Sequence, residues 1–294
     1  MGFSEKLKRL SLKYVLTDTV CQLTVTRYSE FLALLMLDDS SGTHKRFPIG
    51  KITGDRQPLL PIPGTLKTAN PRQRDGMLKL HDLSYHPAST SQPILQNLNL
   101  QLGPQQLGLV IGPSGSGKTT LLEILAGLAH PTAGEVRWRD QILLPEALQQ
   151  LAGLVFQFPE RHFCGHNILE ELRLGHPELP KSRIVETLES VGLGHLSLMA
   201  EPHALSGGQQ RRLALAVQLI RQPYLLLLDE PTAGLDWSMR RQITSLLKQL
   251  KRDWSLLIVT HDAGELTELA DRAWTLDHGI LKPYSLVPSV GASV

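Results

Sequence analysis

The sequence has few cysteines and no apolar segment long enough to cross a membrane, and both shortages exclude classes of protein. Its 294 residues include two cysteines, Cys21 and Cys164. They fall in regions that we assign to different domains, so neither a disulfide nor a cysteine metal site is expected. Apolar runs such as Tyr224–Leu228 and Leu256–Val259 are far shorter than the roughly 20 residues that span a bilayer. Any role at a membrane therefore requires a partner chain.

An excess of charge of either sign is also missing. Thirty basic residues face 28 acidic ones, and the formal net charge is +2, so no nucleic-acid partner is expected. The basic residues near the start are not followed by an apolar segment and a cleavage site, which argues against secretion. Lys6 stands where an acylation motif requires Ser or Thr, which argues against a lipid anchor. A composition of 41% hydrophobic and 20% charged residues is typical of a folded domain.

Residues 1–76 differ from the rest of the chain. Residues 14–53 contain short apolar runs separated by the turn-forming segment 38–42, which predicts a small β-rich N-terminal extension. Residues 57–76 hold four prolines, a composition typical of an extended linker. We place the domain boundary near Asp75, with a second domain over residues 77–294. The function of residues 1–76 is not indicated by any motif, and an extension without catalytic relevance is the alternative interpretation.

A glycine-rich loop follows the first strongly apolar strand of the second domain. Leu107–Ile111 is predicted to be that strand, and Lys118–Leu128 has the apolar spacing of a helix. In this context consecutive backbone N–H groups and a helix N-terminus can cradle phosphate oxygens. Lys118 can reach the β- and γ-phosphates of a nucleotide, and the Thr119 hydroxyl can bind Mg²⁺. The residues expected to surround the phosphates are Gly112, Pro113, Ser114, Gly115, Ser116, Gly117, Lys118, Thr119 and Thr120.

Two adjacent carboxylates end a later strand. Asp229 and Glu230 follow the four leucines 225–228, and the carboxyl end of such a strand should lie beside the phosphate loop. Asp229 is therefore a candidate ligand of Mg²⁺, directly or through water. The alternative, two solvated acids in a turn, fits poorly with the leucines in front of them.

Between these segments lies Leu205-Ser206-Gly207-Gly208-Gln209. The order of phosphate loop, this run, the acidic strand and then His261 resembles the ATP-binding-cassette (ABC) ATPases over residues 77–281. The resemblance implies an α/β fold: a phosphate-loop NTPase core with a mostly parallel sheet, an antiparallel β subdomain, and a helical subdomain over about residues 158–217. Apolar spacing predicts helices over Lys181–Val191, Gln209–Ile220 and Ser238–Leu250.

The resemblance also implies roles for residues that match the family's motifs. It implies that Glu230 polarises the attacking water, and that His261 contacts the γ-phosphate. Gln157, in the sequence Phe-Gln-Phe-Pro-Glu, is expected to reach Mg²⁺ and water from a hinge that leads into the helical subdomain. Tyr85 matches the aromatic residue that stacks on adenine, although ordinary strand packing would also explain it.

A second subunit is part of the site that the resemblance implies. Ser206, Gly207, Gly208 and Gln209 would serve the ATP bound by the opposite subunit, since they offer a hydroxyl, backbone N–H groups and a helix N-terminus. Asp236 occupies the family's D-loop, where Ala233 and Gly234 depart from the usual residues. Two subunits, identical or related, would stack head to tail around two ATP molecules.

The function that these features predict is that of the ATP-hydrolysing subunit of a transporter, peripheral on the cytoplasmic face of the inner or plasma membrane, with a separate membrane permease as partner. Residues 155–175 look most like the cobalt and energy-coupling-factor importers, which implies a metal ion or a vitamin as the solute. One alternative is a soluble ABC mechanoenzyme acting on ribosomes or DNA, although neither a second cassette nor a long coiled coil is present. Another is a regulator that does not turn over, which the intact Lys118, Asp229, Glu230 and His261 argue against.

Overall fold

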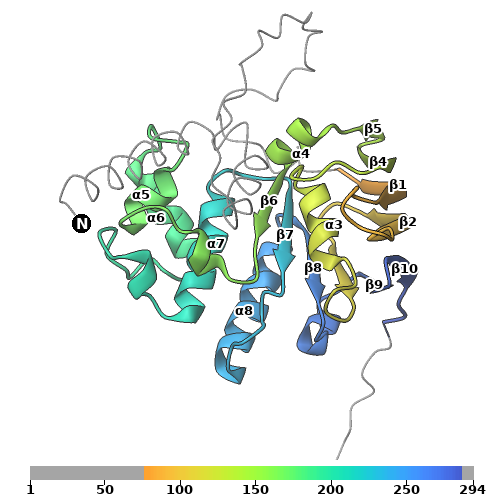
Figure 1. The fold of residues 1–294 in the computed structure, drawn as a ribbon. Helices are drawn as coiled ribbons and strands as arrows, with labels where there is room; N and C mark the ends of the chain where they lie inside the picture. Colours follow the sequence, from red (N-terminus) through yellow and green to blue (C-terminus); the bar gives the residue numbers. More distant parts are fainter. Residues whose placement is uncertain (1–75, 287–294) are drawn as a thin grey trace, which may run out of the picture.

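The computed structural model describes residues 76–286, which form two sheets and a set of helices (Figure 1). The larger sheet has six strands in the order β10-β9-β3-β8-β7-β6 and the smaller one has four in the order β2-β1-β4-β5. The strands of the large sheet are β3 (Leu107–Ile111), β6 (Ala152–Val155), β7 (Leu225–Asp229), β8 (Ser255–Thr260), β9 (Arg272–Asp277) and β10 (Ile280–Pro283). Those of the small sheet are β1 (Leu78–Tyr85), β2 (Leu95–Leu102), β4 (Ala133–Trp138) and β5 (Gln141–Ile142).

The helices connect the strands and cover the large sheet. The α-helices are α3 (Lys118–Leu125), α4 (Pro145–Leu151), α5 (Ile168–Arg173), α6 (Lys181–Ser190), α7 (Gly207–Leu219) and α8 (Trp237–Leu250). Short 3₁₀ helices are η2 (Pro159–His162), η3 (Pro202–Ala204) and η4 (Gly264–Glu268). No helix among residues 76–286 combines the length and the apolar character that a membrane span needs.

The large sheet is parallel except at one edge, which confirms the α/β prediction. Strands β9, β3, β8, β7 and β6 pair in parallel, while β10 pairs with β9 in the antiparallel direction. Every residue of β7 and of β8 is buried, because helices or the small sheet cover both faces of these inner strands. The apolar runs that the sequence shows at 225–228 and 256–259 are thus central strands.

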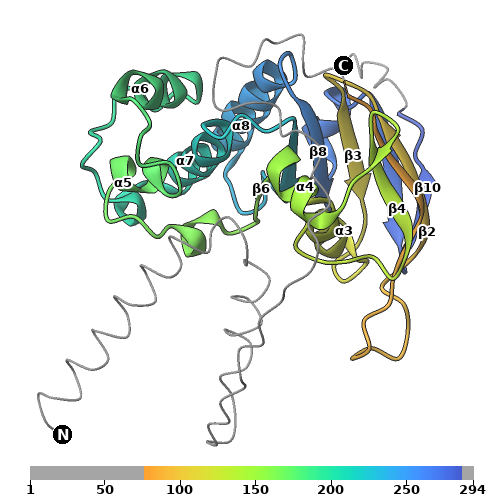
Figure 2. The same cartoon turned by 90° about the horizontal axis from the view of Figure 1, so that it is seen from above.

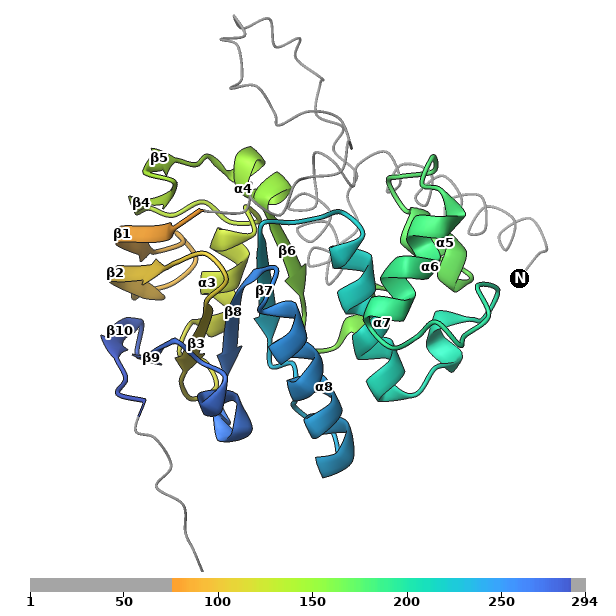
Figure 3. The same ribbon diagram turned by 180° about the vertical axis from the view of Figure 1, so that it is seen from behind.

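Alternate residues of the central strands face two different hydrophobic cores. Leu226 and Leu228 of β7 pack in a core with α5, α6, α7 and α8. Leu225 and Leu227 pack in the other core, with α3, α4 and the small sheet. Figure 3 shows α7 and α8 side by side against the first of these faces. The period of two in a strand therefore places α3 and α7 on opposite faces of the large sheet.

The small sheet and the helical region lie at opposite ends of the molecule (Figure 2). Strand β1 is an inner strand of the small sheet, pairing with β2 on one side and with β4 on the other, both antiparallel. Helices α5, α6 and α7 form the helical region. Both parts agree with the antiparallel β subdomain and the helical subdomain expected from the family resemblance.

Helix ends agree with the sequence expectation to within three residues. The largest difference is in α3, which ends at Leu125 rather than Leu128. Ala126 is its C-cap and Gly127 has φ = +72°, a left-handed conformation that stops a helix and favours glycine. The β-rich extension and the proline-rich linker predicted within residues 1–76 lie outside the described residues, apart from Gly76 itself.

Candidate nucleotide site

The carboxyl ends of three parallel strands, β3, β7 and β8, bring three sequence motifs to one edge of the large sheet. Ile111 of β3 pairs with Thr260 of β8, and Asp229 of β7 pairs with Val259. The phosphate loop begins directly after β3, and Glu230 and His261 directly follow β7 and β8. Parallel strands place their carboxyl ends at the same edge, so three motifs separated by up to about 150 residues in sequence become neighbours.

The phosphate loop connects β3 to α3 and is closely packed at its base. A Cβ atom on Gly112 would lie 2.1 Å from the carbonyl oxygen of Leu276, so this position requires glycine. Gly115 and Gly117 have φ values of +81° and +100°, where glycine is favoured. The Lys118 ammonium donates hydrogen bonds to the carbonyl oxygens of Gly112 and Pro113, at 2.8 and 2.9 Å. The loop thus folds around its own lysine.

Two features of this loop fit the phosphates of a nucleotide. The hydroxyl of Ser116 is buried, and no hydrogen-bond partner for it is found within the described residues, which is uncommon for a buried polar atom. Pro113, Ser114 and Gly115 are exposed, so the outer side of the loop is accessible. Lys118 is 7% exposed and brings a positive charge to the same place. An anion with several acceptor oxygens would satisfy both groups.

Thr119 and Asp229 meet where a divalent cation is expected. The Thr119 hydroxyl donates a hydrogen bond of 2.7 Å to Oδ2 of Asp229. Burial, and then the neighbouring Glu230, raise the pKa of Asp229, while the Thr119 hydrogen bond lowers it. Burial and Asp229 also raise the pKa of Glu123. Hydroxyl and carboxylate oxygens are ligands that suit Mg²⁺. A bound cation would also offset the burial that raises the pKa of these carboxyl groups.

Glu230 is held in place by the strand beside it. It is 5% exposed, and its Oε1 accepts a hydrogen bond from the backbone N–H of His261 at 2.8 Å. The His261 ring Nδ1 lies at the same distance from Oε1, and the Thr260 hydroxyl donates to Oε2 at 2.8 Å. The Lys118 ammonium is 3.9 Å from Oε1. The carboxylate therefore has a fixed direction beside the phosphate loop.

Thr260 is a site residue that the motif analysis did not identify. The sequence could have indicated this residue by its position. It immediately precedes His261, and it pairs in register with β3, the strand that ends at the phosphate loop. Arg211 is a second: its guanidinium donates to the carbonyl oxygens of Glu230 and Ala233, at 2.7 and 2.6 Å. Arg211 lies one helical turn before the buried Leu215 of α7. A basic residue on the apolar face of a helix is unusual, and this could have indicated its role from the sequence.

Gln157 and Tyr85 both lie close to this edge. Gln157 follows β6, and Tyr85 is the last residue of β1. Val155 of β6 pairs with Leu228 of β7, so Gln157, two residues on, follows the same edge at the level of Glu230. No hydrogen bond to the Gln157 side chain is found within residues 76–286. Tyr85 ends β1, and its carbonyl oxygen accepts from the N–H of Ile94 at 2.8 Å. A Cβ on Gly117 would lie 3.1 Å from the carbonyl oxygen of Ile94, so the segment around Tyr85 borders the phosphate loop.

Residues 206–209, which we call the signature, form the N-terminus of α7, the signature helix, and their polar groups hydrogen-bond to one another. The Ser206 N–H donates to Oε1 of Gln209 at 2.9 Å, and the Ser206 hydroxyl accepts from the Gln209 N–H at 3.4 Å, which is a capping box. Ser206 and Gly207 are exposed, whereas Gly208 is buried. Asp236 is the N-cap of α8, since its Oδ1 accepts from the N–H of Met239 at 2.9 Å. Ser206, Gln209 and Asp236 thus each have a local structural role.

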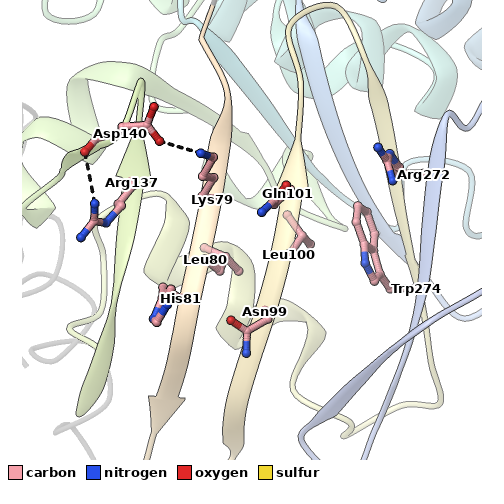
Figure 4. A pocket seen from close by; sticks show the side chains of 10 residues that line it. All are labelled: Lys79, Leu80, His81, Asn99, Leu100, Gln101, Arg137, Asp140, Arg272 and Trp274. Atoms are coloured by element: carbon pink, nitrogen blue, oxygen red, sulfur yellow. Dashed lines mark hydrogen bonds and ion pairs between the residues drawn. The ribbon is translucent and has the colours of Figure 1, made fainter.

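A hollow of about 600 Å³ lies elsewhere, beside β1 and β2 and close to β9 (Figure 4). It contains three cationic side chains, Lys79, Arg137 and Arg272, and the Trp274 ring. Lys79 donates a 2.6 Å hydrogen bond to Asp140 and thereby lowers the pKa of Asp140. Arg137 donates to Glu135 at 2.6 Å. Two of the three cations are already neutralised, so the hollow offers an anion little beyond Arg272.

Comparison with known proteins agrees with this geometry. A model of the ABC transporter family matches residues 95–233. ABC transporter I family member 11, chloroplastic, from Arabidopsis thaliana is 43% identical over 221 residues, which cover 69% of this chain and 78% of that protein. The energy-coupling factor transporter ATP-binding protein EcfA1 of Halalkalibacterium halodurans is 34% identical over 213 residues, covering 69% and 76%.

A solved structure has the same fold. It is that of cbiO1 from Clostridium perfringens, described as part of the ABC transporter complex cbiONQ. It superposes with a TM-score of 0.65 at 27% sequence identity, over 71% of this chain and 87% of that one. The motif order, the shared strand edge and these relatives lead to one conclusion: the chain belongs to the ABC transporter family of ATP-binding proteins.

Proposed function

We propose that this protein hydrolyses ATP and thereby drives a solute through a separate membrane permease. The observation that carries the proposal is the placement of Glu230, a buried carboxylate aligned by Thr260 and His261 and set 3.9 Å from the Lys118 ammonium. A general base must be held within hydrogen-bond reach of the water it activates. Glu230 accepts the proton of that water, and His261, at the mouth of the site with 52% of its side chain exposed, contacts the γ-phosphate.

The remaining groups of the edge bind and orient ATP. Lys118 and the loop N–H groups hold the β- and γ-phosphates, and Tyr85 supports the adenine. Thr119, Asp229 and Gln157 would hold Mg²⁺, which neutralises charge that develops on the phosphate oxygens. The raised pKa of Asp229 supports this assignment, because a buried carboxylate is stabilised in its charged form by a cation.

The site is completed by a second ATPase subunit, identical or related. Among residues 76–286, a Cβ on Gly207 would meet no atom within 4 Å, and Gly207 does not have a positive φ. Nothing in the described part of this subunit therefore requires glycine there, while close approach of a partner's nucleotide to an exposed helix N-terminus would. Ser206, Gly207, Gly208 and Gln209 bind that nucleotide, and Asp236 keeps the neighbouring loop in place by capping α8.

The link to transport comes from the relatives. One relative is named as an energy-coupling factor transporter ATP-binding protein, and a similar solved structure is described as part of an ABC transporter complex. By this likeness the protein sits peripherally on a permease at the cytoplasmic face of a membrane. The resemblance of residues 155–175 to the cobalt and energy-coupling-factor importers supports a metal ion or a vitamin as the solute.

The experiment is copurification of tagged Glu230→Gln protein from native membranes in ATP and Mg²⁺. Loss of the base should stabilise the ATP-bound assembly, so a multispanning protein should copurify at a higher yield than with Lys118→Ala, the matched variant that cannot hold the phosphates. Recovery of ribosomal or DNA-bound proteins without a membrane protein would overturn the transport proposal in favour of a mechanoenzyme. A Glu230→Gln protein that stays monomeric in ATP and Mg²⁺ would overturn the two-subunit site.

A further inference from the structure

The side chain of Arg211 joins the signature helix to the turn that follows Glu230. Its Nη1 donates to the carbonyl oxygen of Glu230 at 2.7 Å and its Nη2 to that of Ala233 at 2.6 Å. The same turn is closed by the Ala233 N–H, which donates to the Glu230 carbonyl at 3.1 Å. One planar guanidinium thus holds both ends of a four-residue turn, a geometry that a lysine ammonium does not reproduce.

This turn has a demanding backbone. Glu230 has φ = +47°, a left-handed conformation that is costly for residues other than glycine. Its N–H remains part of the sheet, donating to Val259 at 2.9 Å. The Glu230 carbonyl lies where the chain leaves the strand. Arg211, which belongs to α7, donates a hydrogen bond to this carbonyl and thereby fixes its direction. A change in the position of the guanidinium would therefore act on Glu230 directly.

Arg211 also lies where three segments meet. Burial lowers the pKa of Arg211, and the charges of Glu160 and Glu230 oppose this effect. Glu160 belongs to η2, which packs against α7 and begins two residues after Gln157. The arginine thus belongs to the signature helix and is close to both the hinge segment and the turn after β7. Its two hydrogen bonds go to that turn alone.

We infer that Arg211 is a positioning residue that transmits the position of the signature helix to Glu230, so that nucleotide contact at Ser206 and Gly207 governs hydrolysis in the same subunit's own site. The inference rests on the proposed function, because it takes the nucleotide at α7 to be the partner's. Ser206 and Arg211 are five residues apart, about 7.5 Å along a helix, and a hydrogen-bonded helix moves over that length as a unit. Arg211 therefore links one ATP site to the other.

The first test measures the turn without nucleotide. Hydrogen exchange of the amides in residues 230–236 is compared in wild type, Arg211→Ala and Arg221→Ala. Arg221 is the matched control: it directly follows Ile220, the C-cap of α7, burial lowers its pKa, and it donates to the Gln149 carbonyl at 3.2 Å. Exchange should rise at least about tenfold in Arg211→Ala and not in Arg221→Ala. Equal exchange in the two variants would overturn the role of Arg211.

The second test separates positioning from folding. In steady-state hydrolysis, Arg211→Ala should lower kcat at least about tenfold and change KM for ATP less than about threefold, because its bonds go to the turn rather than to the nucleotide. Arg211→Lys, which restores one cationic nitrogen in place of the two that bond the turn, should recover part of kcat. Loss of kcat no larger than in Arg221→Ala would overturn the inference.

The link between the two sites is tested by combining Arg211→Ala with Ser206→Ala. If Arg211 transmits contact at Ser206, the double variant should lose less kcat than the product of the two single losses. Losses that multiply would overturn the link. Wild-type protein that binds ATP but shows no hydrolysis, alone or with its membrane partner, would count against the proposed function, while the exchange experiment would still decide whether Arg211 holds the turn.

Discussion

The two halves of the proposed site differ in how complete they are within one chain. At the phosphate loop, Lys118, Thr119, Asp229 and Glu230 are buried or bonded to one another. At the signature, Ser206 and Gly207 are exposed, and the hydrogen bonds of Ser206 stay within the first turn of α7. The difference supports the proposal that one subunit binds the nucleotide with its own phosphate loop, whereas use of the signature requires another molecule.

The strongest way to break this comparison is Lys118→Ala. Removing the ammonium takes away charge-assisted hydrogen bonds to phosphate, and we expect ATP affinity of the single subunit to fall by about 3 kcal/mol, roughly 150-fold in Kd. The measurement is titration with ATP and Mg²⁺ at protein concentrations that keep the chain monomeric. The control is Lys251→Ala, which removes a 2.7 Å ion pair with Asp271 away from the loop. Unchanged Kd in Lys118→Ala would contradict the assignment.

Two glycine substitutions test the comparison through their effect on the free energy of unfolding. Gly112→Ala places a Cβ 2.1 Å from a backbone oxygen, so we expect a loss of about 2 kcal/mol in the free energy of unfolding. Gly207→Ala meets no atom within 4 Å and should leave stability unchanged or raise it by up to about 1 kcal/mol. Urea unfolding measures both. In a Glu230→Gln background, however, Gly207→Ala should prevent the ATP-dependent dimer. Equal stability losses would show that both glycines serve the subunit's own packing.

Thr260→Val tests whether the phosphate half is preassembled around Glu230. The change keeps the volume of the side chain and removes the hydroxyl that donates to Oε2. Glu230 should lose its alignment, and kcat should fall at least about tenfold with little change in ATP affinity. Thr260→Ser, which keeps the donor, should restore most of the rate. A valine variant with wild-type kcat would mean that the backbone N–H of His261 suffices.

The smallest expected effect concerns pH and Asp229. Because the folded pKa of Asp229 is raised, the folded protein binds more protons than the unfolded chain between the ordinary aspartate value and the raised one. Stability without nucleotide or Mg²⁺ should therefore fall as pH rises through that window. Asp229→Asn removes this contribution and should be about 0.5–1 kcal/mol more stable than wild type at pH 7. Urea unfolding at several pH values measures the difference, and a difference that does not grow with pH would contradict the assignment.

Much of the fold was predictable because its signals are local. The apolar runs before Gly112, Asp229 and His261 are strands of the large sheet, and their shared edge follows from parallel pairing. The small sheet was implied by family resemblance rather than by pattern, since β1 pairs with β2 and β4 through contacts between residues far apart in sequence. Such pairing depends on long-range packing, which no short window contains.

The residues of the site also divide into those that local sequence motifs predict and those that only the three-dimensional structure identifies. Glycines, Lys118 and the two acids belong to motifs in which chemistry demands fixed spacing, and they are found by reading along the chain. Thr260 and Arg211 act on Glu230 through bonds to its carboxylate and its carbonyl. Their residue types are common, and their meaning comes from the register of β8 with β7 and from the face that α7 presents to the sheet. Three-dimensional placement, rather than residue type, makes them part of the site.

Strand β7 also has a consequence for how the domain unfolds. Its leucines alternate between the two hydrophobic cores, with Leu225 and Leu227 in one and Leu226 and Leu228 in the other. Loss of either core would expose one side of this strand and weaken its pairing with β6 and β8. The helical region and the phosphate-loop region should therefore melt in a single cooperative transition, so that thermal denaturation followed by circular dichroism and by tryptophan fluorescence has one midpoint.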